Sequence, residues 1–387
     1  MSHQNTTFNQ ILQLIPRHLF EKNVKKHKGN FASKGFSCWS QFNAMLFGQL
    51  SGQTGLRGIE IGLSTNRNSL YHLGMKPVKR STLAYANENR SHEIYRDLFY
   101  QLLGRFSVMK KKHKFRFKNP LYSIDASTVD LCLNMFPWAR FREKKGGIKL
   151  HVKLDHSGYI PNFISVTDAK VHERNEIEKM PLSKGDVIVF DRGYTDYKHY
   201  ASYCEKGIYF VTRIKKNAHF TVLTEQDVSS YENIGFDRTI QMAGYYKGKD
   251  CPYKLRIIES YDPETDKKIV LLTNHQTWSP RTISAIYKDR WQIEIFFKTI
   301  KQNLKIKSFF GTSENAVMTQ IWIAMIAFLL LKYLAVMSST EWSVGSFMAV
   351  IPVLLFLKQD IWIWLNKLKP EVSIMNKKDC QMGLALW

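Results

Sequence analysis

Three carboxylates stand where the surrounding sequence could support metal chemistry. Asp125 follows the strand-like run LYSI, Asp191 follows VIVF, and Glu294 lies within YKDRWQIEIFFKTIK at residues 287–301. A buried carboxylate without a partner costs on the order of several kcal/mol, so each needs a cation or an opening to a cleft. Three such groups without His or Cys would form a hard oxygen site, which suits Mg²⁺ or Mn²⁺ better than zinc. Ions held there could activate the attacking oxygen and stabilise the leaving oxygen of a phosphodiester.

The stretch around Glu294 has the spacing of an amphipathic helix. At 100° per residue its polar and charged positions fall on one face: Tyr287, Arg290, Glu294, Lys298 and Lys301. One interpretation is a solvated surface on which Arg290 and Lys298 each form an i,i+4 ion pair with Glu294, worth about 0.3–0.5 kcal/mol. The other is that Glu294 is a metal ligand facing a cleft, with basic neighbours that hold an anionic polymer. The helix alone leaves both interpretations open.

The elements before this helix must bring the two aspartates to it. Short runs rich in Ile and Val begin at residue 121 and predict strands: LYSID, IKLHVKLD, IPNFISVT, VIVFD and IYFVTRI. Helical segments fall between the later runs, which predicts a mixed α/β sheet whose strands end at Asp125 and Asp191. After residue 215 the shorter runs TIQMAGYYKG, YKLRIIESY and KKIVLLTN predict a β insertion.

Residues 7–105 have helical patterns. We expect helices at FNQILQLIPRHLFEKNV, SQFNAMLFGQL, TGLRGIEIGL and STLAYANENRSHEIYRDLFYQLL, the last with Ser81 as its N-cap. With Lys79 and Arg80 in the turn before it and Arg90 within it, this last helix could lie in a DNA groove. An ordinary helical bundle with solvated charges is an equal alternative.

The basic run KKKHKFRFK at 110–118 contains no acid. Its first three residues, Lys110, Lys111 and Lys112, open a connector for which we expect phosphate contact. Across the 387 residues, 56 Lys and Arg face 33 Asp and Glu, a net charge of +23. Because the excess is interleaved with polar and aromatic residues, it favours nucleic acid over a membrane surface as the partner.

The remaining composition points to a globular protein of the cytoplasm. An apolar fraction of 44% fits a folded chain, and five scattered cysteines show neither zinc spacing nor a disulfide framework. The N-terminus lacks the apolar run of a signal peptide. The apolar stretch IWIAMIAFLLL is shorter than the roughly 20 residues that span a bilayer, so we expect a buried core helix and no membrane partner.

A motif of fixed spacing now connects these features. Tyr287, Arg290, Glu294 and Lys301 satisfy the pattern Tyr-x2-Arg-x3-Glu-x6-Lys, and the segments YSIDAST, VFDRGY, GIKLHVKLD and TDAKVHERN accompany it. In these residues the chain resembles the DDE transposases of bacterial insertion sequences, specifically the insertion sequence 4 family. The resemblance covers roughly residues 120 to 335 and is weaker in the N-terminal hundred residues.

The resemblance implies a fold, a domain order and a set of roles. The fold would be α/β, a ribonuclease-H-like mixed sheet with a β insertion, preceded by an all-helical DNA-binding region and followed by C-terminal helices. The expected segments are a DNA-binding region at 1–108, a linker at 109–120, a core at 121–214 and 276–337, an insertion at 215–275, and helices at 338–387 that could support dimerisation.

In the family mechanism, Asp125, Asp191 and Glu294 would bind Mg²⁺, for which Mn²⁺ can substitute. Tyr287, Arg290, Lys298 and Lys301 would contact phosphates near the cleaved end. The expected partners are double-stranded DNA at the terminal inverted repeats, target DNA and a second copy in a homodimeric synaptic complex. The family commonly cuts through a hairpin intermediate with a flipped base held by an aromatic residue, and the run KKIVLLTN contains no aromatic.

Two other functions remain open at this point. A nuclease or resolvase on the same core would cut DNA and never join it. A catalytically inactive DNA-binding remnant or repressor would bind the repeats only, although the presence of all three carboxylates argues against it.

Overall fold

The structure is a computed structural model that describes residues 5–31, 33, 35–106, 112–142, 145–171, 173–243, 250–263, 266–304, 306, 308–340 and 342–367. The chain divides into two compact units, one of Met1–Met109 with Thr299–Trp387 and one of Lys110–Lys298. The predicted phosphate contacts at Lys110 and Lys111, and the tail beyond residue 367, lie outside the described residues. The division at residue 298 cuts the segment 276–337 that the sequence assigns to one core, so the domain boundaries stay predictions.

The unit Lys110–Lys298 is a mixed α/β structure, as the sequence predicts. Its elements in chain order are β1 (Leu121–Leu131), η4 (Pro137–Ala139), β2 (Arg140–Arg142), β3 (Lys145–Asp155), β4 (Ile160–Asp168), α7 (Glu173–Ile177), β5 (Val187–Phe190), η5 (Arg192–Tyr194), α8 (Tyr197–Glu205), β6 (Tyr209–Arg213), β7 (Phe220–Glu225), β8 (Ile234–Met242), β9 (Lys254–Asp262), β10 (Lys267–Thr273), α10 (Pro280–Asp289) and α11 (Trp291–Lys298). The described strands join into one ten-stranded sheet.

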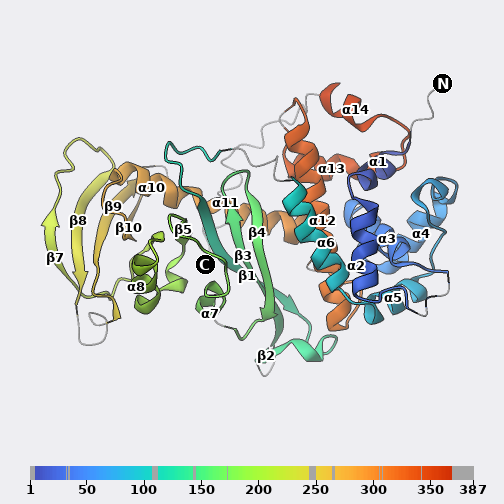
Figure 1. Cartoon of the computed structure of the whole chain (residues 1–387), viewed down its shortest axis with the longest axis horizontal. Coiled ribbons are helices and arrows are strands. Elements are labelled where there is room, and N and C mark those ends of the chain that lie inside the picture. Colours follow the sequence, from blue (N-terminus) through green and yellow to red (C-terminus); the bar gives the residue numbers. More distant parts are fainter. Residues whose placement is uncertain are drawn as a thin grey trace. The chain divides into compact units, whose positions relative to one another are not determined.

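The order of the strands is β2-β3-β1-β5-β6-β10-β9-β8-β7, with β4 paired to β3. The antiparallel pairs β1–β3 and β3–β4 come first in the chain, and β5 and β6 then add in parallel to β1 through connections that contain α7 and α8. Strands β7 to β10, expected as an insertion, continue the same sheet because β10 pairs with β6 (Figure 1).

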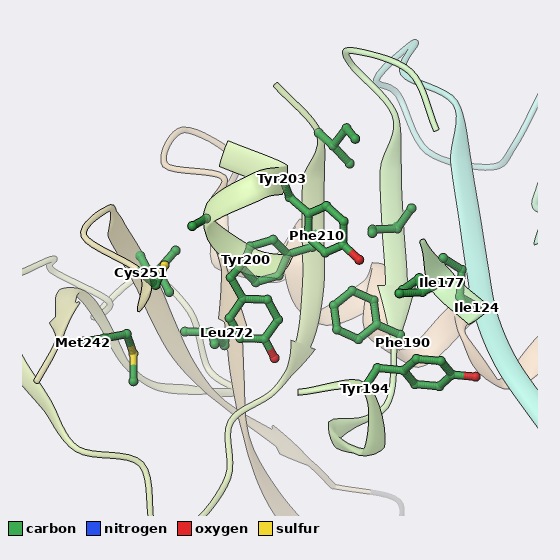
Figure 2. Packing of buried hydrophobic residues seen from close by; sticks show 14 of the residues in the cluster. Ile124, Ile177, Phe190, Tyr194, Tyr200, Tyr203, Phe210, Met242, Cys251 and Leu272 are labelled. Atoms are coloured by element: carbon green, nitrogen blue, oxygen red, sulfur yellow. The ribbon is translucent and has the colours of Figure 1, made fainter. Parts of the chain in front are cut away.

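The side chains of the short strand β5 alternate between two hydrophobic clusters, one on each face of the sheet. Val187 and Val189 pack in a cluster with residues of α10, and Ile188 and Phe190 pack on the opposite face in a cluster with residues of α8. Figure 2 shows the α8 side, where Phe190 lies beside Tyr200. Successive side chains of a strand point to opposite faces, so the pattern VIVF fills both layers. A residue after Phe190 therefore falls on the α10 side.

Two sequence predictions about this unit are wrong in detail. The first strand does not end at Asp125, because β1 continues to Leu131 with an unbroken antiparallel pairing to β3. The helix that carries the motif is not continuous either. Helix α10 ends at Asp289, Arg290 is its C-cap, and α11 begins at Trp291.

The unit that contains both chain ends is helical in the described part. Its elements are α1 (Thr7–Gln13), α2 (Arg17–Lys26), α3 (Cys38–Leu50), α4 (Leu56–Thr65), η1 (Arg67–Ser69), η2 (Tyr71–Leu73), α5 (Arg80–Asn89), α6 (Glu93–Arg105), the π-helical turn η6 (Thr299–Asn303), α12 (Glu314–Met337), α13 (Val344–Leu354) and α14 (Ile361–Lys367).

Two of the helices expected in this unit are split. Pro16 separates α1 from α2, since proline favours the start of a helix and disrupts its interior. The expected helix at 81–103 is also two helices, α5 and α6, and the N-cap of α5 is Lys79 and not Ser81.

Helix α12 is longer than the apolar stretch that predicts it. Over 24 residues it is long and apolar enough to cross a membrane, yet 78% of its most apolar window is buried inside the protein. It packs against α3, α5, α6 and α13. The core helix of a globular protein meets the same test of length and composition, so this helix is weak evidence for a membrane span.

Candidate active site

The parallel register of β1 and β5 brings Asp125 and Asp191 next to each other. The last pair in that register is Ile124 with Phe190, and each aspartate is the next residue along its own segment. Neighbouring strands lie roughly 4.8 Å apart, so the two backbones are adjacent there. By alternation both carboxylates belong to the face of the sheet on which α10 packs.

Arg290 connects Asp125 to Glu294. Its Nη1 lies 3.4 Å from Asp125 Oδ2, and its Nη2 donates to Glu294 Oε1 at 2.7 Å. Only 13% of the Arg290 side chain is exposed, so this i,i+4 pair is not the solvated surface pair that the helix spacing allowed. The corner between α10 and α11 therefore places Glu294 beside β1.

Tyr287 connects the same corner to the third carboxylate. Its hydroxyl donates to Asp191 Oδ1 at 3.3 Å, and the Arg290 guanidinium carbon lies 5.6 Å from the centre of its ring. Burial raises the pKa of Tyr287 to about 12, with Arg290 opposing and Asp191 adding to the effect, so the phenol stays protonated as a donor. Asp125, Asp191 and Glu294 are thus linked through two neighbouring side chains of the motif.

The environment of Asp125 disfavours its charge. Burial raises its pKa to about 7, Arg290 and the Ala126 amide act in the opposite direction, and Glu294 and Glu173 add repulsion. The Ala126 amide donates to Asp125 Oδ1 at 2.8 Å. A carboxylate held in this way gains from an added cation, because the cation would stabilise the ionised form.

Two further residues next to the carboxylates were missed by the sequence reasoning. Glu173, at the start of α7, repels Asp125 electrostatically and pairs with Lys149 at 3.5 Å. Tyr194, in η5, is 2% exposed, and burial together with Asp125 and Glu173 raises its pKa far above the ordinary value. Glu173 lies within the segment TDAKVHERN and Tyr194 ends the segment VFDRGY, so the sequence offered both segments, but neither residue was chosen as a site residue.

The three carboxylates match a divalent ion in the kind of ligand they offer. Three carboxylates supply only oxygen ligands, which fits Mg²⁺ or Mn²⁺ in kind. Two polar atoms of the site, Tyr194 Oη and Arg290 Nε, are buried without a hydrogen-bond partner among the described residues. The arrangement itself is not a closed ligand group, since no three His, Cys, Asp or Glu side chains in the described ranges stand close enough to hold an ion. Arg290 provides the positive charge between Asp125 and Glu294 in this arrangement.

The other predicted DNA contacts of the motif lie further along the chain. Lys298 is exposed at the end of α11. Lys301 lies in the π-helical turn η6, which belongs to the helical unit.

The basic residues predicted around α5 have different surroundings. Lys79 is 83% exposed in its side chain and lies 3.4 Å from Glu60, and Arg80 is exposed with its amide donating to Glu60. The Arg90 guanidinium donates to Gln41 and to the carbonyl oxygen of Phe36. Lys79 and Arg80 thus face solvent, whereas Arg90 is engaged within the helical unit.

The described part of the connector, residues 112–119, alternates between two environments. Its basic side chains are exposed: Lys112, Lys114, Arg116 and Lys118. Its rings are half-buried against the α10 side of the sheet, with Phe117 stacked on Trp278 at 4.1 Å between ring centres. Lys114 pairs with the buried Asp289 at 2.6 Å, so the other basic residues form what we call the basic ridge, Lys112, Arg116 and Lys118.

A cavity of about 350 Å³ lies elsewhere on this unit. Arg281, Ser284 and Lys288 line it from α10, together with residues of β8 and β9. These three positions lie on one face of the helix, away from Tyr287, which points to Asp191. The cavity is therefore separate from the carboxylates.

Comparison with known families supports the relationship that the motif indicates. The sequence model of the family described as a transposase DDE domain matches residues 116–330, more than half of this chain. A second family model, for a domain of unknown function (DUF4372), matches residues 3–76.

Individual proteins are similar over most of their length. A putative transposase, y4zB, of Sinorhizobium fredii is 31% identical over 284 residues, which is 72% of this chain and 78% of the relative. A probable transposase for insertion sequence element IS5377 of Geobacillus stearothermophilus is 28% identical over 264 residues, 67% and 68% of the two chains. The cryo-EM structure of a piggyBac transposase synaptic complex with hairpin DNA covers 90% of this chain and 77% of its own, at 12% identity and a TM-score of 0.44, a likeness too slight to carry an argument.

Proposed function

Because this chain belongs to the DDE transposases of insertion sequences, a family of metal-dependent DNA-cutting enzymes, we propose that Asp125, Asp191 and Glu294 are its catalytic carboxylates. The observation that carries the proposal is the linkage of all three through adjacent residues of one motif. Arg290 contacts Asp125 and Glu294, and Tyr287 donates to Asp191. The three half-buried acids come from β1, the end of β5 and α11, and their linkage through these two side chains supports a shared site for a cation or substrate.

We further propose that the sheet is a ribonuclease-H-like core. The order β4-β3-β1-β5-β6 supports this, because three antiparallel strands are followed by two parallel ones. Asp125 then belongs to the central strand and Asp191 to the end of its parallel neighbour. Strands β7 to β10 would be the family's insertion, here added to the edge at β6.

The bound ion, Mg²⁺ with Mn²⁺ as a substitute, would supply a Lewis acid for the attacking and leaving oxygens of the phosphodiester. The protein's own residues hold the geometry. Tyr287 fixes the orientation of Asp191, and Arg290 keeps Asp125 and Glu294 at a common position before DNA binds.

The DNA would bind along two surfaces. The basic ridge presents three exposed cations in an extended segment whose rings are anchored on the core, an arrangement suited to a phosphate backbone. Lys298 and Lys301 would add phosphate contacts near the cleaved end. In the helical unit, Lys79 is the N-cap of α5 and Arg80 is its first residue. The exposed face of this helix includes Ser81 and Tyr85, and the helix would enter a groove of the terminal inverted repeat.

The proposed reaction is cut-and-paste transposition by two copies in the bacterial cytoplasm. A homodimer would pair the two terminal repeats, and the same carboxylates would cut each end and transfer it to target DNA. The net charge of +23 supports binding of two DNA partners at once.

Purified protein with labelled duplexes carrying the element's own ends tests this proposal. We expect Mg²⁺-dependent cleavage at the end of the repeat and, when pre-cleaved ends are supplied, their joining to a plasmid. Cleavage without joining would favour the nuclease or resolvase function. Binding without either reaction, unchanged by Asp125→Ala, would favour the inactive remnant.

A further inference from the structure

A second group of polar residues is buried behind the carboxylates. His156 Nδ1 lies 2.6 Å from Asp289 Oδ2, and His156 Nε2 lies 2.7 Å from Ser123 Oγ. With the carboxylate as acceptor, Nδ1 carries a proton, and Nε2 shares a second hydrogen bond with the Ser123 hydroxyl. We call Ser123, His156 and Asp289 the buried triad.

The order Ser, His, Asp is that of a nucleophilic relay, but the triad cannot act as one. Ser123 is 0% exposed, His156 is 2% exposed and Asp289 is 5% exposed. A serine nucleophile must reach a reacting carbonyl or phosphoryl group within about 3–3.5 Å. Because the hydroxyl is enclosed in the sheet, no substrate reaches it, and the triad must act through its position.

Two members of the triad are close in sequence to residues of the active site. Ser123 precedes Asp125 by two residues on β1, so the two side chains share one face of the sheet. Asp289 is the last residue of α10 and directly precedes Arg290. The triad therefore joins β1 to the helix corner within two residues of the contact between Asp125 and Arg290.

The hydrogen bonds of Asp289 are completed from two other segments. Lys114, from the connector, lies 2.6 Å from Asp289 Oδ1, and the Tyr159 hydroxyl donates to the carboxylate at 3.2 Å. A buried carboxylate with this many donors has its negative charge compensated and its rotamer fixed. The corner after α10 is thus held by the connector, by the β3–β4 turn and by β1 together.

We propose that the buried triad is a positioning device for the active site, with Ser123, His156 and Asp289 as positioning residues that set the Arg290–Glu294 corner against Asp125. The consequence for catalysis rests on the proposed function. The structural role of the triad, which is to hold the Arg290–Glu294 corner against β1, is independent of the proposed function.

The experiment uses the full-length protein with the variants Ser123→Ala, His156→Asn and Asp289→Asn. Ser123→Ala removes a single oxygen and is the variant least able to disturb folding. Asp237→Asn is the matched control, because Asp237 forms a buried bidentate pair with Arg256 between β8 and β9 of the same sheet, remote in the strand order from β1.

Two readouts separate the inference from the proposed function. Hydrogen–deuterium exchange of the peptide covering residues 286–296 should quicken about tenfold or more in the triad variants and not in Asp237→Asn, since local opening is what the triad opposes. The affinity of the DNA-free protein for Mn²⁺, followed by electron paramagnetic resonance, should fall about tenfold in the triad variants, the range seen when partners that orient metal ligands are removed.

Each outcome decides one question. Faster exchange with weaker Mn²⁺ binding supports the inference in full. Faster exchange in a protein that neither binds Mn²⁺ nor cuts DNA would keep the positioning role and reject the proposed function. Unchanged exchange in all three variants, or equal change in Asp237→Asn, would overturn the inference even if the wild-type protein transposes DNA.

Discussion

The guanidinium of Arg290 lies 3.4 Å from the carboxylate of Asp125, although 165 residues separate the two along the chain. The same group donates to Glu294 at 2.7 Å. Arg290 places a positive charge between these two carboxylates in a half-buried site. The contact therefore defines the electrostatic state of the site before a metal or DNA arrives.

Replacing Arg290 with Gln should raise the pKa of Asp125 above about 7. Burial already raises this pKa, and Arg290 acts against burial, so its loss leaves only the Ala126 amide to oppose burial and the repulsion of Glu294. We expect a rise on the order of one pH unit or more, the effect of removing a neighbouring guanidinium. Carbon-13 NMR titration of the aspartates in metal-free protein measures it. The exposed Arg116→Gln variant is the control, and an unchanged or lower value in Arg290→Gln would contradict the electrostatic account.

Asp125→Asn should stabilise the metal-free protein at pH 8 and lose this advantage in acid. The folded pKa, about 7, lies above the unfolded value of about 3.9, so the folded protein binds the proton more tightly. Wild-type stability then falls as the pH rises from about 4 to about 7, whereas the amide does not titrate. The gain at pH 8 is at most about 4 kcal/mol, reduced by the loss of the Arg290 ion pair and by the 20% exposure of the side chain. Thermal unfolding midpoints of both proteins at pH 5 and pH 8 check the sign, and a difference independent of pH would contradict it.

Glu294→Gln should abolish cleavage and leave DNA binding intact, because the amide cannot hold a divalent ion as the carboxylate does. Lys301→Ala should weaken DNA binding and lower its salt dependence by about one ion. Binding titrations at several salt concentrations and single-turnover cleavage measure the two effects. Equal loss of binding in both variants would contradict this division of roles.

The double variant Arg116→Gln, Lys118→Gln tests the basic ridge. Each phosphate contact contributes about 0.9 to the slope of log K against log salt, so the slope should fall by about two and the affinity should fall for every DNA sequence alike. The control is Lys206→Gln with Lys216→Gln, which removes two charges from exposed lysines outside the ridge. A loss confined to the terminal repeat sequence would show that the ridge reads bases and does not follow the backbone.

The sequence predicts the parts of the site that depend on local patterns. VIVF followed by Asp191 gives a buried strand with a carboxylate at its end, and that strand and the following aspartate are found as expected. The spacing of Tyr287, Arg290 and Glu294 predicts that the three side chains belong to one site. They do so in the structure, although the helix breaks at Arg290 between α10 and α11. The sequence predicts that the first strand ends at Asp125, but pairing with β3 extends this strand to Leu131.

Long-range contacts were not predictable from one sequence. In the sequence, Lys114 is one of several basic residues in the run KKKHKFRFK, and only the fold shows that it pairs with Asp289. His156 and Asp289 are 133 residues apart, and Asp289 occupies a variable position of the motif. Glu173 begins a helix of five residues, too short for a periodic signal. In each case tertiary packing assigns the partner, which local propensity does not encode.

The central claim is that Asp125, Asp191 and Glu294 are ligands of a common divalent-ion site. Replacing each in turn with Cys changes a hard oxygen donor to a soft sulfur donor. Cleavage of the terminal repeat is then measured in Mg²⁺ and in Mn²⁺, an ion that accepts sulfur more readily. We predict that all three Cys variants are inactive in Mg²⁺, that Mn²⁺ restores part of their cleavage, and that DNA binding is unchanged throughout. Full activity of any of the three in Mg²⁺ would contradict the claim.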